Sequence, residues 1–195
     1  LGVDGTKAGK AAGVLFGSFS DFSNLNTSMK TSLQNQAALL DNIGVSMSTT
    51  GAIFDQATKS LGYTSAELVG LTQDIQNVAQ SVGKTSEEVF SDFSKVAESL
   101  AFYGKDAIKV FTELEKQSKA TGLSVDKLVS ISGKAFDTFD GAAQKIGRLN
   151  AILGGPYLNS IDMLNASEAE RIEMLKQSMD MSGQVFNDLN KFEQL

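Results

Sequence analysis

Short joints, each made of a glycine, one further residue and then serine or threonine, divide the middle of this 195-residue chain. They are Leu61-Gly62-Tyr63-Thr64, Val82-Gly83-Lys84-Thr85 and Thr121-Gly122-Leu123-Ser124. Glycine readily adopts the left-handed backbone conformation that ends a helix, and a hydroxyl can accept hydrogen bonds from the free amides of the next helix. The Thr64–Glu67 and Thr85–Glu88 spacings also match the capping box. The joints therefore predict consecutive helices whose ends are specified locally.

The apolar residues between these joints recur at helical spacing. One stripe comprises Leu68, Leu71, Ile75, Val78 and Val82. Steps of three and four residues predict helices, whereas the sustained alternation typical of strands does not occur in the sequence. The fold class predicted is all-α, with helical hairpins or a bundle and a sharp corner at Gly154-Gly155-Pro156. The expected helices span 15–43, 48–61, 64–82, 85–103, 105–121, 124–136, 140–153, 157–165 and 167–192, the last entered through a Ser167–Glu170 box.

A heptad-like pattern runs through the first long helix that we expect. Its members are Leu15, Phe19, Phe22, Asn26, Met29, Leu33, Gln36 and Leu40. Steps of four and three residues are typical of a coiled-coil seam, and a polar residue in such a seam fixes register and oligomer state. We therefore expect these residues to form a partner surface in a homo-oligomer, with a trimer among the options.

The stretch around this seam carries unusually few charges. Residues 18–65 contain five charged side chains and 22 serine, threonine, asparagine or glutamine residues. An ordinary exposed helix has more lysine and glutamate on its outer face. Contact with other protein is one interpretation, and a serine- and threonine-rich solvated surface is the other.

Glycine occurs at every fourth position near the N-terminus, at Gly5, Gly9, Gly13 and Gly17. On a helix these residues would form a smooth ridge that allows close contact with a second helix. The alternative is a flexible lead-in, because each glycine costs about 1 kcal/mol of helix stability. The expected organisation is a glycine-rich lead-in over 1–17, a long helix with a following helix over 18–62, and a helical bundle over 63–195.

The composition argues against catalysis and against nucleic-acid binding. The chain has neither Cys nor His, so it lacks thiol chemistry and the commonest general base and metal ligand. Residues 1–97 contain six basic and nine acidic side chains and residues 98–195 contain 11 and 14, so each part carries −3 and no basic cluster stands out. Carboxylate pairs such as Glu87/Glu88, Glu113/Glu115 and Asp137/Asp140 fit caps and first helical turns better than acid–base catalysis. We expect no enzyme activity, no cofactor, no metal site and no sequence-specific nucleic-acid binding.

Several motifs between Phe102 and Gln177 resemble a segment of phage tail tape measure proteins, especially those of large contractile-tailed phages. They are Tyr103-Gly104-Lys105-Asp106-Ala107, Lys119-Ala120-Thr121-Gly122-Leu123-Ser124, Phe136-Asp137-Thr138-Phe139, Leu149-Asn150-Ala151-Ile152-Leu153-Gly154-Gly155, Tyr157-Leu158-Asn159-Ser160 and Glu170-Arg171-Ile172-Glu173-Met174-Leu175. The resemblance covers about 40% of the chain firmly. It implies a long, mainly helical virion component that lies in the tail tube, sets tail length and leaves ahead of the genome at ejection.

The resemblance implies tail tube and baseplate hub or tail tip proteins as partners. A helix rises about 1.5 Å per residue, so a fully helical chain of this length would reach only about 290 Å. The frequent joints also predict a chain that folds back on itself. We therefore expect an end region of such a protein or a detached folded domain. No signal peptide and no membrane span are recognised in the sequence.

Two other functions fit the residues. One is a membrane-active delivery element that inserts the glycine ridge and Phe16, Phe19 and Phe22 into a bilayer, which would bring membrane contact at ejection. The other is a non-enzymatic helical adaptor.

Overall fold

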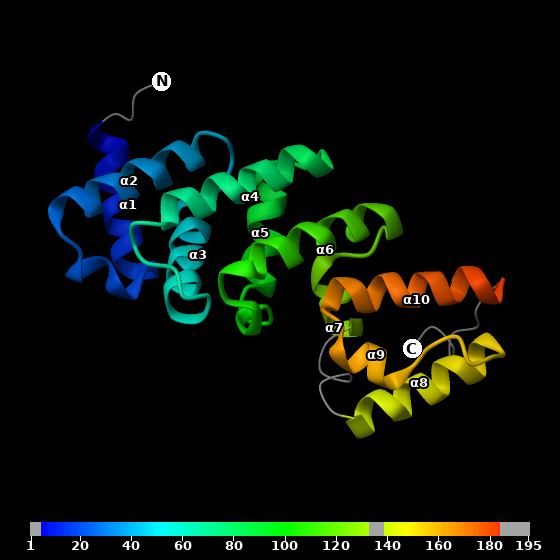
Figure 1. Ribbon diagram of the computed structural model, residues 1–195. Helices are drawn as coiled ribbons and strands as arrows, with labels where there is room; N and C mark the ends of the chain where they lie inside the picture. Colours follow the sequence, from blue (N-terminus) through cyan, green and yellow to red (C-terminus); the bar gives the residue numbers. More distant parts are fainter. Residues whose placement is uncertain (1–4, 133–138, 184–195) are drawn as a thin grey trace. The chain divides into compact units, whose positions relative to one another are not determined.

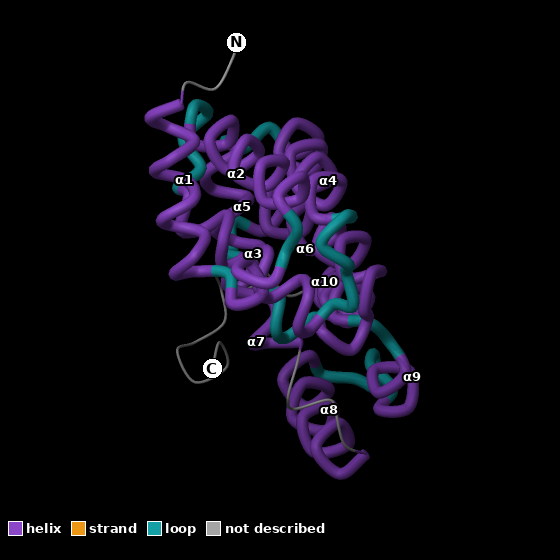
Figure 2. Tube along the Cα trace, turned by 90° about the vertical axis from the view of Figure 1, so that its left-hand side faces the viewer, coloured by secondary structure: helices purple, strands orange, loops and turns teal. Residues whose placement is uncertain are grey.

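The computed structural model describes residues 5–132 and 139–183, and it is all-α there (Figure 1). No strand occurs in these two ranges (Figure 2), which confirms the predicted fold class. The α-helices are α1 Gly5–Ser18, α2 Thr27–Asp41, α3 Met47–Ser60, α4 Leu68–Val82, α5 Ser86–Val96, α6 Ala107–Thr121, α7 Val125–Ser132, α8 Phe139–Leu153, α9 Ser160–Asn165 and α10 Glu168–Ser182. Two 3-10 helices, η1 Ser20–Asn24 and η2 Ala101–Asp106, lie between them.

The chain forms two compact units, Leu1–Lys116 and Gln117–Leu195, and the division falls within α6. In the N-terminal unit α1 packs against both α2 and α3, while α5 packs against α3 and α4. In the C-terminal unit α10 packs against α7 and α8, and α8 packs against α9. The segments expected from the sequence, 1–17, 18–62 and 63–195, do not coincide with these units, because α1 shares a core with the helices that follow it.

The single helix expected over 15–43 is wrong. The helix ends at Ser18, Phe19 is extended with φ −129° and ψ 102°, and α2 begins only at Thr27. Ser20 fixes this break by donating from its amide (2.9 Å) and its hydroxyl (2.6 Å) to the Asp55 carboxylate on α3. The chain therefore folds back into the hairpin of α1 and α2.

Asn26 shows why the heptad pattern was misleading. Its side chain accepts a hydrogen bond from the Met29 amide at 2.9 Å, so Asn26 is the N-cap of α2. Asparagine is among the best N-cap residues, because its side chain replaces a missing backbone acceptor. The polar position that would have fixed a coiled-coil register instead starts a new helix.

The predicted glycine joints are confirmed. Gly62, Gly83 and Gly122 all adopt left-handed conformations, with φ between 71° and 73°. The Thr85–Glu88 capping box is complete: the Thr85 amide and hydroxyl donate to Glu88, and Thr85 accepts from the Glu88 amide. The predicted end of α4 and the predicted start of α5 therefore follow from a four-residue motif.

The joint before α4 differs in detail from the prediction. The Thr64 amide and hydroxyl donate to the Glu67 carboxylate, both at 2.8 Å. The Glu67 amide, however, donates to the Thr64 carbonyl in a turn, and α4 begins at Leu68 instead of at residue 64. Only the carboxylate half of this capping box therefore matches the prediction.

Other predicted ends also shift. Helix α5 stops at Val96 rather than 103, because the chain turns through η2, where Gly104 has φ 53° and ψ −130°. Helix α9 begins at Ser160, capped by Asn159, rather than at 157. The parts of the expected helices over 133–136 and 184–192, and Asp137, lie outside the described residues.

The C-terminal unit contains its own apolar core. Its fully packed members are Ala142, Ile146, Leu153, Leu158 and Met163. The predicted corner follows α8: Gly154 has φ 78°, and Asn150 donates to the Leu158 carbonyl and accepts from the Leu158 amide, both at 2.9 Å. The side chain of Asn150 thus satisfies both backbone groups of Leu158 in the loop that follows the corner.

Gly51 of α3 allows the end of α1 to approach the α3 backbone closely. A β-carbon built at this position would lie 1.9 Å from Ser18 Oγ and 2.8 Å from Ser18 Cβ. The end of α1 therefore rests directly on the α3 backbone, with Ser18 Oγ turned to donate to the Val14 carbonyl. Any side chain at position 51 therefore forces Ser18 or the helices themselves to shift.

We predict that Gly51→Ala lowers the free energy of unfolding by about 1–3 kcal/mol, since the core must be overpacked to admit the methyl group. The matched control is Gly13→Ala in α1, where an added β-carbon meets no described atom within 4 Å. This control should stabilise the chain by about 0.4–1 kcal/mol, because alanine restricts the unfolded chain. Chemical denaturation measures both, and equal effects would contradict the close crossing.

Candidate partner-binding surfaces

The predicted partner seam lies mostly inside the N-terminal unit. Its apolar members Leu15, Phe19, Phe22, Leu33 and Leu40 are all buried, with at most 4% of their surface exposed. Phe19 is the centre of this packing, with ring centroids 6.5 Å from Phe22 and 6.0 Å from Phe54 of α3. The side chains that we expected to meet a second chain are therefore covered within this chain, with Phe19 packed on Phe54 of α3.

The remaining seam residues also have internal roles. Asn26 caps α2, Gln36 donates from Nε2 to Thr72 Oγ1 of α4 at 2.8 Å, and Met29 is half-buried. The seam as a coiled-coil surface is thus wrong. The physical reason is the break over 19–26, which lets α2 turn its apolar face onto α1, α3 and α4.

Large apolar side chains that remain exposed mark other surfaces. In the described residues they are Phe16, Leu39, Ile43, Phe102, Ile161 and Met181. Phe16 is 70% exposed on α1, on the helix that carries Gly5, Gly9, Gly13 and Gly17. All four glycines are exposed, and a β-carbon added at any of them would meet no described atom within 4 Å. The flexible lead-in is therefore wrong for residues 5–17, which form a helix with its glycine ridge outward.

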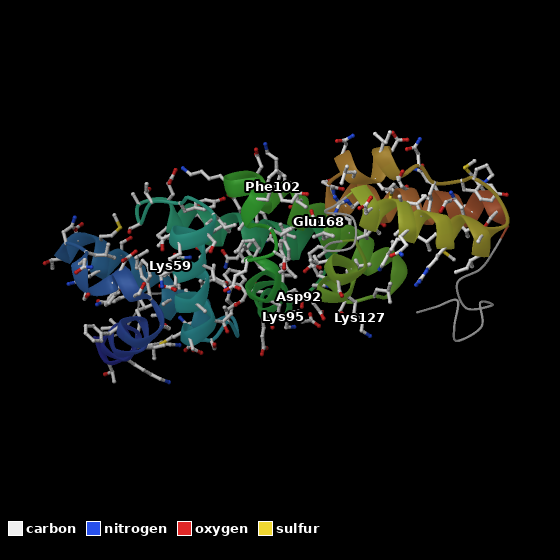
Figure 3. The ribbon with its side chains drawn as sticks, turned by 90° about the horizontal axis from the view of Figure 1, so that it is seen from below. Lys59, Asp92, Lys95, Phe102, Lys127 and Glu168 are labelled. Atoms are coloured by element: carbon white, nitrogen blue, oxygen red, sulfur yellow. The ribbon has the colours of Figure 1, made fainter. Side chains whose placement is uncertain are left out.

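Phe102 is the most exposed of these side chains, at 94%, on the turn before α6 (Figure 3). The turn is tied to the joint before α4: Lys105 Nζ lies 2.6 Å from the Glu67 carboxylate, and Tyr63 Oη donates to the Lys105 carbonyl at 3.2 Å. Its backbone requires Gly104, whose φ of 53° is rarely adopted by other residues. An exposed aromatic ring on a fixed turn resembles the anchor residues of protein interfaces.

A groove of about 400 Å³ lies between α4 and α6. It is lined by Asp74, Asn77, Val78, Ser81, Ile108, Lys109 and Thr112. Val78 and Ile108 contribute apolar side chains to this lining, and Lys109, which also lines the groove, lies 2.8 Å from Asp106. The groove is open and shallow, which is typical of a contact surface rather than of a substrate pocket.

The carboxylate pairs of the sequence have structural partners. Glu88 belongs to a capping box, and Glu113 lies 2.6 Å from Lys116. Hydrogen bonds from the Thr85 hydroxyl and amide lower the pKa of Glu88, which therefore stays ionised at neutral pH. Asp140 lies in the first turn of α8, where negative charge is favourable.

Glu115 differs from every other carboxylate described, because its side chain is fully buried. Lys84, from the joint between α4 and α5, reaches Glu115 Oε2 at 2.6 Å and Asp92 Oδ2 at 3.3 Å. Burial raises the pKa of Glu115 even though the hydrogen bond from Lys84 lowers it. The ion pair ties the joint and α5 to α6 inside the N-terminal unit.

Sequence reasoning missed this pair, although a signal was present. Glu115 follows Phe111 by four residues and Leu114 by one, so it falls on the buried stripe of α6. Grouping Glu113 with Glu115 obscured this, because residues two apart on a helix face different directions. Lys84 sits in a joint and shows no comparable periodicity.

Arg171 is a second buried charge whose role was not expected. It is 5% exposed, and its guanidinium donates from Nε to the Met163 carbonyl at 2.7 Å and from Nη2 to the Leu164 carbonyl at 3.3 Å. These carbonyls belong to the end of α9, where no helical amide follows to bond them. Arg171, which lies on α10, therefore satisfies free carbonyls at the end of α9. It follows directly after the complete Ser167–Glu170 capping box.

In the described part of the chain, no three acidic side chains gather in a way that could hold a metal ion. Likewise, none of the helices described there combines the length and apolar character needed to cross a membrane. No family model, curated protein or solved structure matches the chain.

We predict that Lys84→Met lowers the free energy of unfolding by about 3 kcal/mol at pH 7, because Glu115 then loses its counter-charge in the core. The double variant Lys84→Met/Glu115→Met should recover most of this loss, since it removes both buried charges. Thermal and denaturant unfolding of the wild type, Lys84→Met, Glu115→Met and the double variant completes the double-mutant cycle. Equal losses in the single and double variants would contradict a coupled buried pair.

Glu67 gives a prediction for acid stability. Hydrogen bonds from Lys105 and from the amide and hydroxyl of Thr64 lower the pKa of Glu67 from 4.5 to about 2. A depressed pKa stabilises the folded state above pH 4.5, and this stabilisation is lost as the pH falls from 4.5 to 2. Glu67→Gln should therefore lose less stability than the wild type across this range in thermal unfolding. A parallel pH profile would contradict the assignment, and Glu113→Gln controls for the chemical change.

Proposed function

We propose that this chain is a non-enzymatic, folded part of a phage tail tape measure protein that contacts the tail tube or the baseplate hub. In this role it is a structural component of the virion, and the full protein sets tail length and leaves at genome ejection. The proposal rests on the resemblance of the stretch from Phe102 to Gln177 to tape measure proteins. It rests also on the structural roles of the residues that carry this resemblance.

The motifs that carry the resemblance build helix ends, and this observation supports a structural role most directly. Gly122 ends α6 in a left-handed conformation, and the Asn150 side chain hydrogen-bonds both backbone groups of Leu158 across the Gly154 corner. Arg171 donates a hydrogen bond to a free carbonyl at the end of α9. None of these contacts positions a nucleophile or an acid–base pair. Motifs of this kind preserve the shape of a helical unit, as expected for a protein whose function is contact.

The two compact units support an end region rather than an extended ruler. A ruler needs helices that continue along one axis, at about 1.5 Å per residue. Here the longest described helices have 15 residues, and α1, α2 and α3 pack against one another. A folded-back chain of this kind suits a place where the tape meets the tube or hub.

Exposed aromatic residues supply candidate contacts for these partners. Phe16 beside the outward glycines and Phe102 on its fixed turn both present apolar surface that the chain itself leaves uncovered in the described residues. Aromatic anchors commonly dominate the binding energy of protein interfaces. The homo-oligomer expected from the sequence would likewise have to use these surfaces, since the seam is buried.

A membrane-active delivery element is a second candidate, and exposed Phe16 on α1 is the observation that favours it. The other aromatic residues of that hypothesis are buried, Phe19 against Phe54 of α3 and Phe22 against Phe19, and they cannot enter a bilayer unless the unit unfolds. Helix α1 has 14 residues, fewer than the roughly 20 that span a bilayer. The tail-contact proposal therefore takes precedence over insertion by this folded form.

The test uses virions of the phage that encodes the chain. We expect an antibody against the chain to detect it in purified tails, and to find it lost from tails after triggered ejection. Purified chain should also bind isolated tail tube or hub protein in sedimentation assays. Absence from purified virions, or a monodisperse monomer without affinity for tube and hub proteins, would refute the proposal.

The contact surface can be tested in the same assay with the double variant Phe16→Ser/Phe102→Ser. Both side chains are mostly exposed, so we expect stability within about 0.5 kcal/mol of the wild type. Binding to tube or hub protein should fall at least ten-fold, and leakage from liposomes should be absent for both proteins. Ile161→Ser, at another exposed apolar residue, is the matched control; wild-type binding by the double variant would rule out these two anchors.

A further inference from the structure

We propose that the carboxyl group of Glu115 is a proton-binding site in the core, through which the N-terminal unit gains stability on mild acidification. This inference concerns the interior of the unit and does not depend on the proposed function. It rests on the burial of Glu115, on one carboxylate oxygen to which no described residue donates a hydrogen bond, and on the balance of charge around Lys84.

The two carboxylate oxygens of Glu115 differ in their surroundings. Oε2 accepts a hydrogen bond from Lys84 Nζ at 2.6 Å. Oε1 is buried and accepts no hydrogen bond from any described residue. An ionised carboxylate oxygen without a donor is costly in the core, and a proton on that oxygen removes the charge while Oε2 still accepts from Lys84.

Charges on the neighbouring elements also favour protonation. Lys84 comes from the joint after α4, Glu88, Asp92 and Lys95 come from α5, and Glu115 comes from α6. Lys84 Nζ forms ion pairs with both Glu115 and Asp92, and Lys95 Nζ lies 3.2 Å from Asp92 Oδ1. Among the described residues, Asp92 therefore has two ammonium partners and Glu115 has one. These groups comprise three carboxylates and two ammonium groups, and one bound proton removes the excess negative charge.

Glu115 rather than Asp92 or Lys84 is the group that exchanges the proton. Its side chain is fully buried, whereas that of Asp92 is 15% exposed. Burial raises the pKa of Glu115, and the charges of Asp92 and Glu88 raise it further. Burial would lower the pKa of Lys84, but its hydrogen bond to Glu115 and the charges of both carboxylates outweigh burial and raise it, so the ammonium keeps its proton.

The direction of the linkage follows from these shifts. The folded protein takes up the proton at a higher pH than the unfolded chain, whose glutamate has the ordinary pKa of 4.5. The folding equilibrium therefore gains stability as the pH falls from the raised pKa toward 4.5, by up to ten-fold for each pH unit between the two values. Capping glutamates such as Glu67 and Glu88 have lowered pKa values and reduce stability only below that window.

The direct experiment is a ¹³C NMR titration of the glutamate side-chain carboxyl carbons in the full chain. We expect Glu115 to titrate with a midpoint above 4.5, in contrast to Glu88, which should titrate below it. Asp92→Asn should lower the Glu115 midpoint, because a neighbouring negative charge is removed, and Lys84→Met should raise it. A Glu115 midpoint at or below 4.5, or one that does not respond to Asp92→Asn, overturns the proposal.

Stability measurements provide a second, independent test. The ratio of the wild-type folding equilibrium constant to that of Glu115→Gln should rise as the pH falls through the window, because the amide binds no proton. Glu113→Gln, the same change at an exposed position of α6, should leave the Glu115 midpoint unchanged. Parallel pH profiles of the wild type and Glu115→Gln overturn the proposal, and the NMR titration of the wild type decides the matter if Glu115→Gln fails to fold.

Discussion

Helix ends must have their free amides and carbonyls satisfied within a few residues, and the whole architecture depends on how this chain does so. Gly83 and Thr85 stop one helix and start the next within four residues. Where no such motif is available, a side chain from elsewhere supplies the bond, as Asp55 does for Ser20 and Arg171 does for the end of α9. Because the helices stop so often, their apolar faces are buried against one another within the same chain.

The elements predicted correctly are those whose determinants lie close together in sequence. The Gly62, Gly83 and Gly122 joints, the Ser167–Glu170 box and the Gly154 corner each depend on a handful of neighbouring residues, and all are present. The break near Asn26 was not predicted, because asparagine at that position fits both a coiled-coil seam and an N-cap. Asp55, which fixes the break, lies 35 residues from Ser20, beyond the reach of any local pattern.

The candidate surface was harder to predict than the fold, for a related reason. An apolar stripe shows which face of a helix is buried, but it does not show whether the cover comes from the same chain. Phe19 could have faced a second copy; it faces Phe54 because α1 and α2 form a hairpin that α3 completes. Exposure of Phe102 depends on the turn that Gly104 and Lys105 fix, and no hydrophobic periodicity marks such a turn.

The distribution of charge connects the fold with the proposed role. Charged side chains at the joints are committed to internal contacts: Glu67 to Lys105, Glu88 to Thr85, and Lys84 to Glu115. The outer face of α1, by contrast, presents glycines and Phe16, a combination that lowers helix stability without any internal contact to offset it. Under the proposed function this cost has an explanation, since the glycines leave room beside Phe16 for the backbone of a tail protein to approach closely. This close approach must then come from another molecule, because a β-carbon added at any of the four glycines would meet no described atom of this chain within 4 Å.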